Sequence, residues 1–115
     1  MSAVGVLLKF IAKPGMKAAL EAHLIEQAGI AGGEPGTLCF VVHASPIEPD
    51  AVFLYEAYVN EGAKALHESA STYAAVREKT GHLTVGHPVA IPLLPLKGKG
   101  LNIRAESISR SDTEN

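Results

Sequence analysis

Apolar and polar residues follow two spacings along the chain, and each change of spacing marks the end of an expected element. Residues 3–12 are almost continuously apolar with one charge, Lys9, which predicts a strand that ends before Pro14 and Gly15. Beyond this turn, apolar residues recur at every fourth position, which predicts an amphipathic helix that ends in the glycine-rich residues 29–36. The apolar positions of this helix are Met16, Leu20, Leu24 and Ala28.

Two further strands and a second helix are expected in the middle of the chain. Residues 37–44 and 51–59 are rich in β-branched and aromatic residues, and the two prolines between them predict a connecting loop. Asn60 is a suitable cap for a helix that Gly81 is expected to stop, with a break near residues 69–71. The apolar stripe of this helix is formed by Ala63, Leu66, His67, Ala70 and Ala74.

The last expected strand, residues 89–96, is rich in proline, which removes backbone donors and favours the edge of a sheet. One domain is expected over residues 1–96, followed by an arm or disordered tail over residues 97–115. The element order β-α-β-β-α-β predicts an α+β fold of the ferredoxin-like type, an antiparallel sheet with both helices on one face.

The strand at residues 51–59 is apolar on both of its faces. Val52 and Leu54 point to one face, whereas Phe53 and Tyr55 point to the other. Two helices cover only one face of a sheet. The other face is therefore expected to pack against a second copy of the chain in a two-fold symmetric homodimer.

Composition narrows the class of protein. The 115 residues suit one domain, and 10 basic against 12 acidic residues provide no positive field, so nucleic acid is not an expected partner. The single cysteine, Cys39, and the lack of a secretory pattern favour the reducing cytoplasm. The apolar runs are shorter than the ~20 residues that span a bilayer, so no membrane contact is expected.

Glu56 is a lone carboxylate within the apolar residues 52–59. An unpaired buried charge costs on the order of several kcal/mol, so a partner for Glu56 is expected. One interpretation is a structural hydrogen bond at the sheet. The other is a role in a functional site, because such sites also hold carboxyl groups in apolar surroundings.

Two histidines on helical apolar stripes are expected to face the sheet. If Glu56 reaches one ring nitrogen of His67, the other nitrogen is available as a general base; a buried core histidine is the alternative. His23 lies at the edge of the first stripe, so it is a second candidate for the same space. Surface or loop positions are expected for His43, His82 and His87.

Aromatic residues are the candidate substrate contacts, and a metal site is not expected. Tyr55, Tyr73 and Phe40 are suited to a ring-shaped ligand, although aromatic side chains on strands and stripes also serve as core. The histidines and the one cysteine lack the spacing of common metal sites.

The motif PGTLCFVV, followed by VFLYEAYVNEGAKALHESASTY, resembles the antibiotic-biosynthesis-monooxygenase family, and the resemblance covers about residues 3–96. It implies a dimeric α+β barrel that oxidises quinols or aromatic polyketides with dioxygen and without metal or flavin. Glu56 and His67 match the family's glutamate and histidine, and His23 matches a histidine of isomerase-like members. Thr72 stands where many members carry a second histidine, and the tryptophan of the haem-degrading branch is missing.

The first functional hypothesis is a cofactor-independent monooxygenase for a phenolic or quinol-like substrate. His67 or His23 would take the phenolic proton, while Glu56 would fix the imidazole tautomer. One alternative is an isomerase of a small phosphorylated carbonyl compound, which would use the same base. The other is a non-catalytic dimer that binds an aromatic ligand, which the absence of the second histidine favours.

Overall fold

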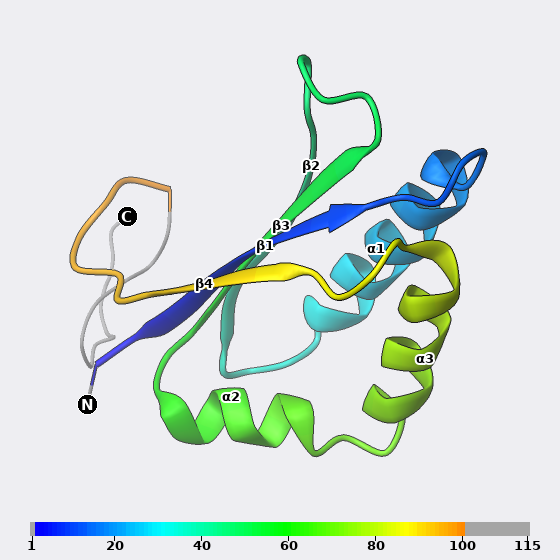
Figure 1. The fold of residues 1–115 in the computed structure, drawn as a ribbon. Helices are drawn as coiled ribbons and strands as arrows, with labels where there is room; N and C mark the ends of the chain where they lie inside the picture. Colours follow the sequence, from blue (N-terminus) through cyan, green and yellow to red (C-terminus); the bar gives the residue numbers. More distant parts are fainter. Residues whose placement is uncertain (1, 101–115) are drawn as a thin grey trace.

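The computed structural model describes residues 2–100 of the chain. Within them, residues 94–100 form neither helix nor strand, and most of the expected tail, residues 101–115, lies outside the described residues. The elements in chain order are β1 (Val4–Ile11), α1 (Lys17–Ala31), β2 (Thr37–Ala44), β3 (Ala51–Tyr58), α2 (Glu61–Glu68), α3 (Tyr73–Leu83) and β4 (Val89–Leu93), as Figure 1 shows.

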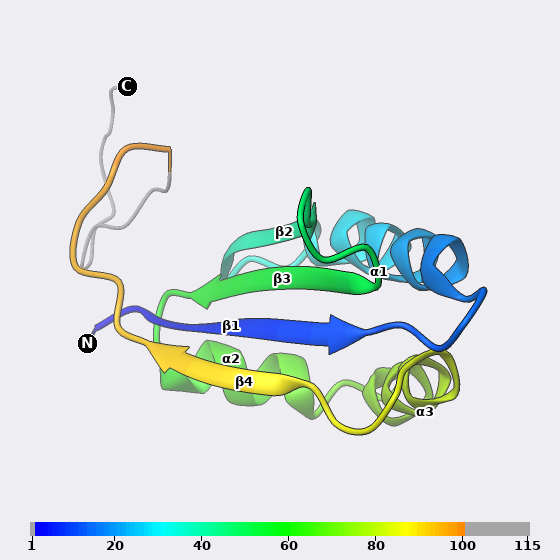
Figure 2. The same ribbon diagram turned by 45° about the horizontal axis from the view of Figure 1, so that its top comes forward.

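The four strands form one antiparallel sheet in the order β2-β3-β1-β4, and Figure 2 shows the strands side by side in this order. All three helices lie on the same side of this sheet (Figure 1). The expected ferredoxin-like α+β fold is confirmed. The proline-containing β4 lies at the edge, as expected, but it is shorter than residues 89–96. Its last paired residue, Leu93, lies opposite Gly5, and β1 offers almost no partner beyond that point.

The second expected helix is divided into α2 and α3. Asn60 caps α2, because its side-chain oxygen accepts a hydrogen bond from the backbone nitrogen of Ala63 at 2.8 Å. The predicted stop at Gly81 is wrong, since α3 continues to Leu83. The next residue, Thr84, is extended and forms an antiparallel β-bridge with Ala12, which follows β1. The expected apolar stripe is also wrong at Leu66, because this residue is 72% exposed on α2 and does not face the sheet.

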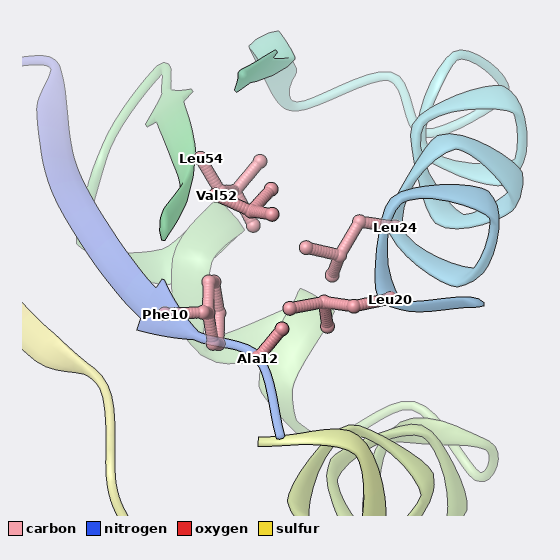
Figure 3. Close-up of a cluster of buried hydrophobic side chains, with 6 residues drawn as sticks. All are labelled: Phe10, Ala12, Leu20, Leu24, Val52 and Leu54. Atoms are coloured by element: carbon pink, nitrogen blue, oxygen red, sulfur yellow. The ribbon is translucent and has the colours of Figure 1, made fainter. Parts of the chain in front are cut away.

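The hydrophobic core lies between the sheet and α1. Six buried side chains from β1, its continuation, α1 and β3 form it, and Figure 3 shows them together: Phe10, Ala12, Leu20, Leu24, Val52 and Leu54. Helices α2 and α3 contribute no buried residue. Space is therefore left between these two helices and the sheet.

Within the described residues, no helix has the length and apolar character needed to cross a membrane.

Candidate functional site

A cavity of about 400 Å³ lies between the sheet and the helices, in the size range of small-molecule sites. Its sheet wall is apolar apart from Glu56, and its helix wall brings His67 and Arg77 to the same space. The apolar side chains that line it include Leu8, Phe10, Phe40, Leu54, Tyr73 and Val76.

His67 on the cavity wall is held by Glu34. Its Nδ1 atom lies 2.9 Å from Oε1 and 3.0 Å from Oε2 of that carboxylate. A carboxylate only accepts hydrogen bonds, so Nδ1 carries a proton, and Nε2 is an acceptor whenever the ring is neutral. Nε2 has no hydrogen-bond partner among residues 2–100, and it is therefore available to a ligand.

The loop that carries Glu34 is fixed on both sides. Thr37 Oγ1 donates to Glu34 Oε1 at 2.7 Å, and the carbonyl of Gly36 accepts from the backbone nitrogen of Val59 at 3.0 Å. A Cβ atom added at Gly36 would lie 2.6 Å from Cβ of Ala63 on α2. Glycine thus allows the loop to lie close enough to α2 for Glu34 to reach His67.

A register shift in β2 supports the same loop. Thr37 lies opposite Tyr58, but Cys39 lies opposite Ala57, so one extra residue is accommodated between them. The shift brings Thr37 to the helix-covered face, which Tyr58 shares. Its hydroxyl is thereby placed beside Glu34.

Glu56 lies on the cavity wall but does not hold His67. Its Oε1 accepts a hydrogen bond from the Tyr58 hydroxyl at 2.5 Å, and the structure gives the expected histidine contact to Glu34 instead. Burial raises the pKa of Glu56, while the Tyr58 hydrogen bond and the nearby His67 act in the opposite direction. Burial and the Glu56 charge raise the pKa of Tyr58, so its hydroxyl stays protonated as a donor.

Three aromatic rings surround the imidazole of His67. The ring centroids of Tyr58, Tyr73 and Phe40 lie 5.4, 5.6 and 6.3 Å from it. The candidates Phe40 and Tyr73 both line the cavity. Tyr55 does not, because it points to the opposite face of the sheet, where its hydroxyl lies over Gly5.

His23 is buried between α1 and α3, apart from the cavity lining. Its Nε2 lies 2.8 Å from Thr80 Oγ1, and that hydroxyl already donates to the carbonyl of Val76, so Nε2 is the donor. Nδ1 of His23 has no partner. Burial, and then the charge of Lys79, lower the pKa of this histidine. The structure does not bring His23 together with His67.

Sequence reasoning did not assign three of the residues that line the cavity, Glu34, Thr72 and His87, to this site. Glu34 lies in a glycine-rich turn, where no periodic pattern assigns a direction to a side chain. His87, expected in a loop, is exposed and also lines the cavity, as does Thr72 at the position of the missing second histidine. Among residues 2–100, no three histidine, cysteine or acidic side chains group as a metal site would require.

Comparison with known proteins identifies the family. The family model of antibiotic biosynthesis monooxygenase matches residues 3–79. The chain belongs to this family. The match includes Glu34, Glu56 and His67 and ends within α3. A search among proteins of curated function finds no match.

Solved structures share the fold of this family member. Rv0793 of Mycobacterium tuberculosis is 24% identical, with a TM-score of 0.77, over 86% of this chain and all of that one (100%). A Chloroflexus aurantiacus protein, provisionally named an antibiotic biosynthesis monooxygenase, is 27% identical, with a TM-score of 0.76, over 87% and 99%. A Caulobacter crescentus protein with the same provisional name is 23% identical, with a TM-score of 0.77, over 84% and 92%.

Proposed function

We propose that the protein is a monooxygenase that oxidises a phenolic or quinol-like aromatic compound with dioxygen and needs neither metal nor flavin. The observation that carries this proposal is the contact between His67 and Glu34 on the wall of an apolar cavity. It provides a base with a defined tautomer in a space suited to an aromatic ring. Membership of the antibiotic biosynthesis monooxygenase family supports the reaction class.

The first step is removal of the phenolic proton. Nε2 of His67 accepts it, and the carboxylate of Glu34 stabilises the imidazolium that forms. The resulting phenolate is electron-rich and passes an electron to dioxygen. For a phenol with an open para position, one oxygen atom ends in the quinone product and the other leaves as water, so one dioxygen accounts for both.

The remaining cavity residues position the substrate and exclude water. Phe40 and Tyr73 offer ring faces near the imidazole, at centroid distances of 6.3 and 5.6 Å. Leu8 and Leu54 add apolar surface on the sheet side. A dry cavity strengthens the interaction between Glu34 and the imidazolium and protects a reactive phenolate intermediate.

Oxygen uptake with α-naphthol as the phenolic probe tests this function. The wild type is expected to form α-naphthoquinone, with isotope from labelled dioxygen in the new carbonyl. His67→Ala is expected to lose roughly a hundredfold or more of the rate, since general-base catalysis contributes about that much. His82→Ala is the matched control, because that histidine is 75% exposed on α3. Equal rates in all three proteins would remove His67 from the mechanism.

A proton-transfer isomerase is the second candidate. The cavity offers both an acid and a base for such a reaction. Glu56 and His67 both line it, and burial promotes the neutral, proton-donating form of Glu56. Arg77 on the same wall is the candidate contact for a phosphate group of a small carbonyl substrate. Solvent deuterium uptake into such a compound without oxygen consumption would support the isomerase. Saturable binding with neither reaction would support a non-catalytic ligand-binding dimer.

The assembly proposed for this enzyme is a cytoplasmic homodimer with sheet packed on sheet. On the face away from the helices, the strand register aligns Val41, Tyr55, Leu7 and Ile91 in one row. Val41 and Ile91 are 42% and 47% exposed, so the row is an uncovered apolar surface in a single chain. A second copy would cover it. We also propose that the domain ends near residue 96.

A further inference from the structure

The two oxygens of Glu56 have different surroundings. Oε1 accepts the hydroxyl hydrogen of Tyr58 at 2.5 Å. Oε2 makes no hydrogen bond within residues 2–100, although Glu56 lines the cavity. Among residues 2–100, Nδ1 of His23 is the one fully buried side-chain nitrogen or oxygen without a hydrogen-bond partner, so Oε2 of Glu56 is not fully buried. Because Glu56 lines the cavity, Oε2 is within reach of a ligand there.

Two basic side chains near Glu56 already have acidic partners. Lys64 lies 2.7 Å from Glu68, and His67 lies 2.9 Å from Glu34. Burial is the largest influence on the pKa of Glu56 and raises it; the charge of Glu68 acts in the same direction, whereas Tyr58, His67 and Lys64 oppose it. A carboxyl group in this position keeps its proton most readily on the oxygen that accepts nothing, which is Oε2.

We propose that Glu56 is a ligand-binding hydrogen-bond donor, which presents its Oε2 proton to a carbonyl oxygen of an aromatic ketone or quinone in the cavity. Tyr58 is its positioning residue, because the hydroxyl of Tyr58 occupies Oε1 and directs Oε2 toward the ligand. This inference rests on the proposed function only in placing an aromatic ligand in the same cavity. It changes the expected role of Glu56 from orienting the imidazole to contacting the ligand.

The site then has two poles of opposite hydrogen-bonding character. Nε2 of His67 accepts from a hydroxyl group, whereas Glu56 donates to a carbonyl group. A phenol that is oxidised at a ring carbon gains a carbonyl group, so one pole suits the substrate and the other suits the product.

Infrared spectroscopy with α-tetralone tests this contact without any turnover. α-Tetralone is an aromatic ketone without an acidic hydroxyl group, and isotope at its carbonyl carbon separates its stretching band from protein bands. The wild type is expected to shift that band to lower frequency on binding. Glu56→Gln is expected to keep the shift, because the amide also donates. Glu56→Leu is expected to lose it and to bind α-tetralone roughly fivefold more weakly.

Tetralin, which lacks the carbonyl group, is the matched ligand. Its affinity is expected to be the same for wild type and Glu56→Gln, and no weaker for Glu56→Leu. A shift that persists in Glu56→Leu would overturn the proposal, as would a ligand-free wild type whose Glu56 shows a carboxylate band and no carboxylic acid band at neutral pH. The infrared band of Glu56 in the ligand-free protein tests the donor role even if α-tetralone does not bind.

The outcomes separate this inference from the proposed oxidation. A carbonyl shift that depends on Glu56, together with no oxygen uptake from α-naphthol, would keep the donor and exclude the monooxygenase. Oxygen uptake that depends on His67, without any Glu56-dependent shift, would do the reverse. Tyr58→Phe is expected to weaken the shift without abolishing it, because the carboxyl group remains but is oriented less well.

Discussion

His67 and Glu34 form the contact on which the candidate site depends. Nδ1 of the ring lies 2.9 and 3.0 Å from the two carboxylate oxygens, although the residues are 33 positions apart in the chain. The side chains are 18% and 30% exposed, so the pair is only partly screened by water. The contact fixes the ring and leaves Nε2 as an acceptor in the cavity.

Replacement of Glu34 tests this positioning role. Glu34→Ala is expected to lower kcat for phenol oxidation by about 10- to 100-fold, as is usual when the partner that orients a histidine is lost. KM is expected to change little, because Glu34 contacts the histidine rather than the ring of the substrate. Glu34→Gln is expected to recover part of kcat, since its amide oxygen accepts from Nδ1. Steady-state oxygen uptake measures both constants.

Glu78→Ala is the control for this experiment, because Glu78 is 77% exposed on α3 and lies outside the cavity lining. Its kcat is expected to match that of the wild type. If Glu34→Ala had the same kcat as Glu78→Ala, the contact with His67 would be structural only.

The close approach of Gly36 to α2 gives a second prediction. A Cβ at this position would lie 2.6 Å from Cβ of Ala63, which is closer than side-chain carbons approach one another. Gly36→Ala is expected to lower the free energy of unfolding by about 1–3 kcal/mol, the usual effect of overpacking. It is also expected to reduce kcat, because the loop moves away from α2 and takes Glu34 with it. Chemical denaturation and oxygen uptake measure the two effects.

The double variant Gly36→Ala/Ala63→Gly is the matched test. It removes the opposing methyl group, so kcat is expected to return toward the wild-type value. Stability should recover only in part, because glycine within a helix costs up to about 1 kcal/mol relative to alanine. No recovery of kcat would show that the clash is not what displaces Glu34.

The fold was predictable because its information is local and periodic. The run of apolar residues in β1 and the four-residue spacing in α1 each follow from backbone geometry, so the sequence is sufficient to locate them. Ends of elements were less certain for a physical reason. Gly81 tolerates a helical conformation, and β4 ends where its partner strand ends, which depends on tertiary pairing.

The site was predictable only in part. Glu56 and His67 stood out because a polar residue in an apolar pattern needs an explanation, and the cavity contains both. Their partners were not predictable. Glu34 lies in a turn without periodicity, and Thr37 reaches it only through a register shift that no local pattern marks. Tyr58 donates its hydrogen bond to Glu56 because residues two apart in a strand point to the same face of the sheet.

His23 predicts how stability depends on pH. Burial and Lys79 lower its pKa in the folded protein relative to the ordinary value of 6.5. The unfolded chain therefore binds the proton more readily, and stability rises with pH in this range. The contribution is fully present above about pH 6.5 and is expected to be lost as the pH falls below it. Denaturation curves at neutral and mildly acidic pH measure the loss.

Geometry explains why protonation of His23 is unfavourable. Nε2 already donates to Thr80, and a second proton would leave an N–H at Nδ1, which has no partner. His23→Leu is expected to reduce the dependence of stability on pH, whereas the exposed variant His82→Ala is expected to keep it. An unchanged pH dependence in His23→Leu would assign the effect to another group.

The open face of the sheet gives the last prediction. Ile91 lies opposite Leu7, which in turn lies opposite Tyr55 on β3, so a charge at Ile91 would lie in the apolar row that the proposed interface covers. Sedimentation equilibrium is expected to show a dimer for the wild type and a monomer for Ile91→Lys, because burial of an unpaired charge opposes association. Leu66→Lys is the control, since Leu66 is 72% exposed on α2, on the helix side of the sheet. A wild type that stays monomeric at every concentration would leave the apolar row uncovered and exclude sheet-on-sheet pairing, whereas dimers of all three proteins would move the interface to another surface.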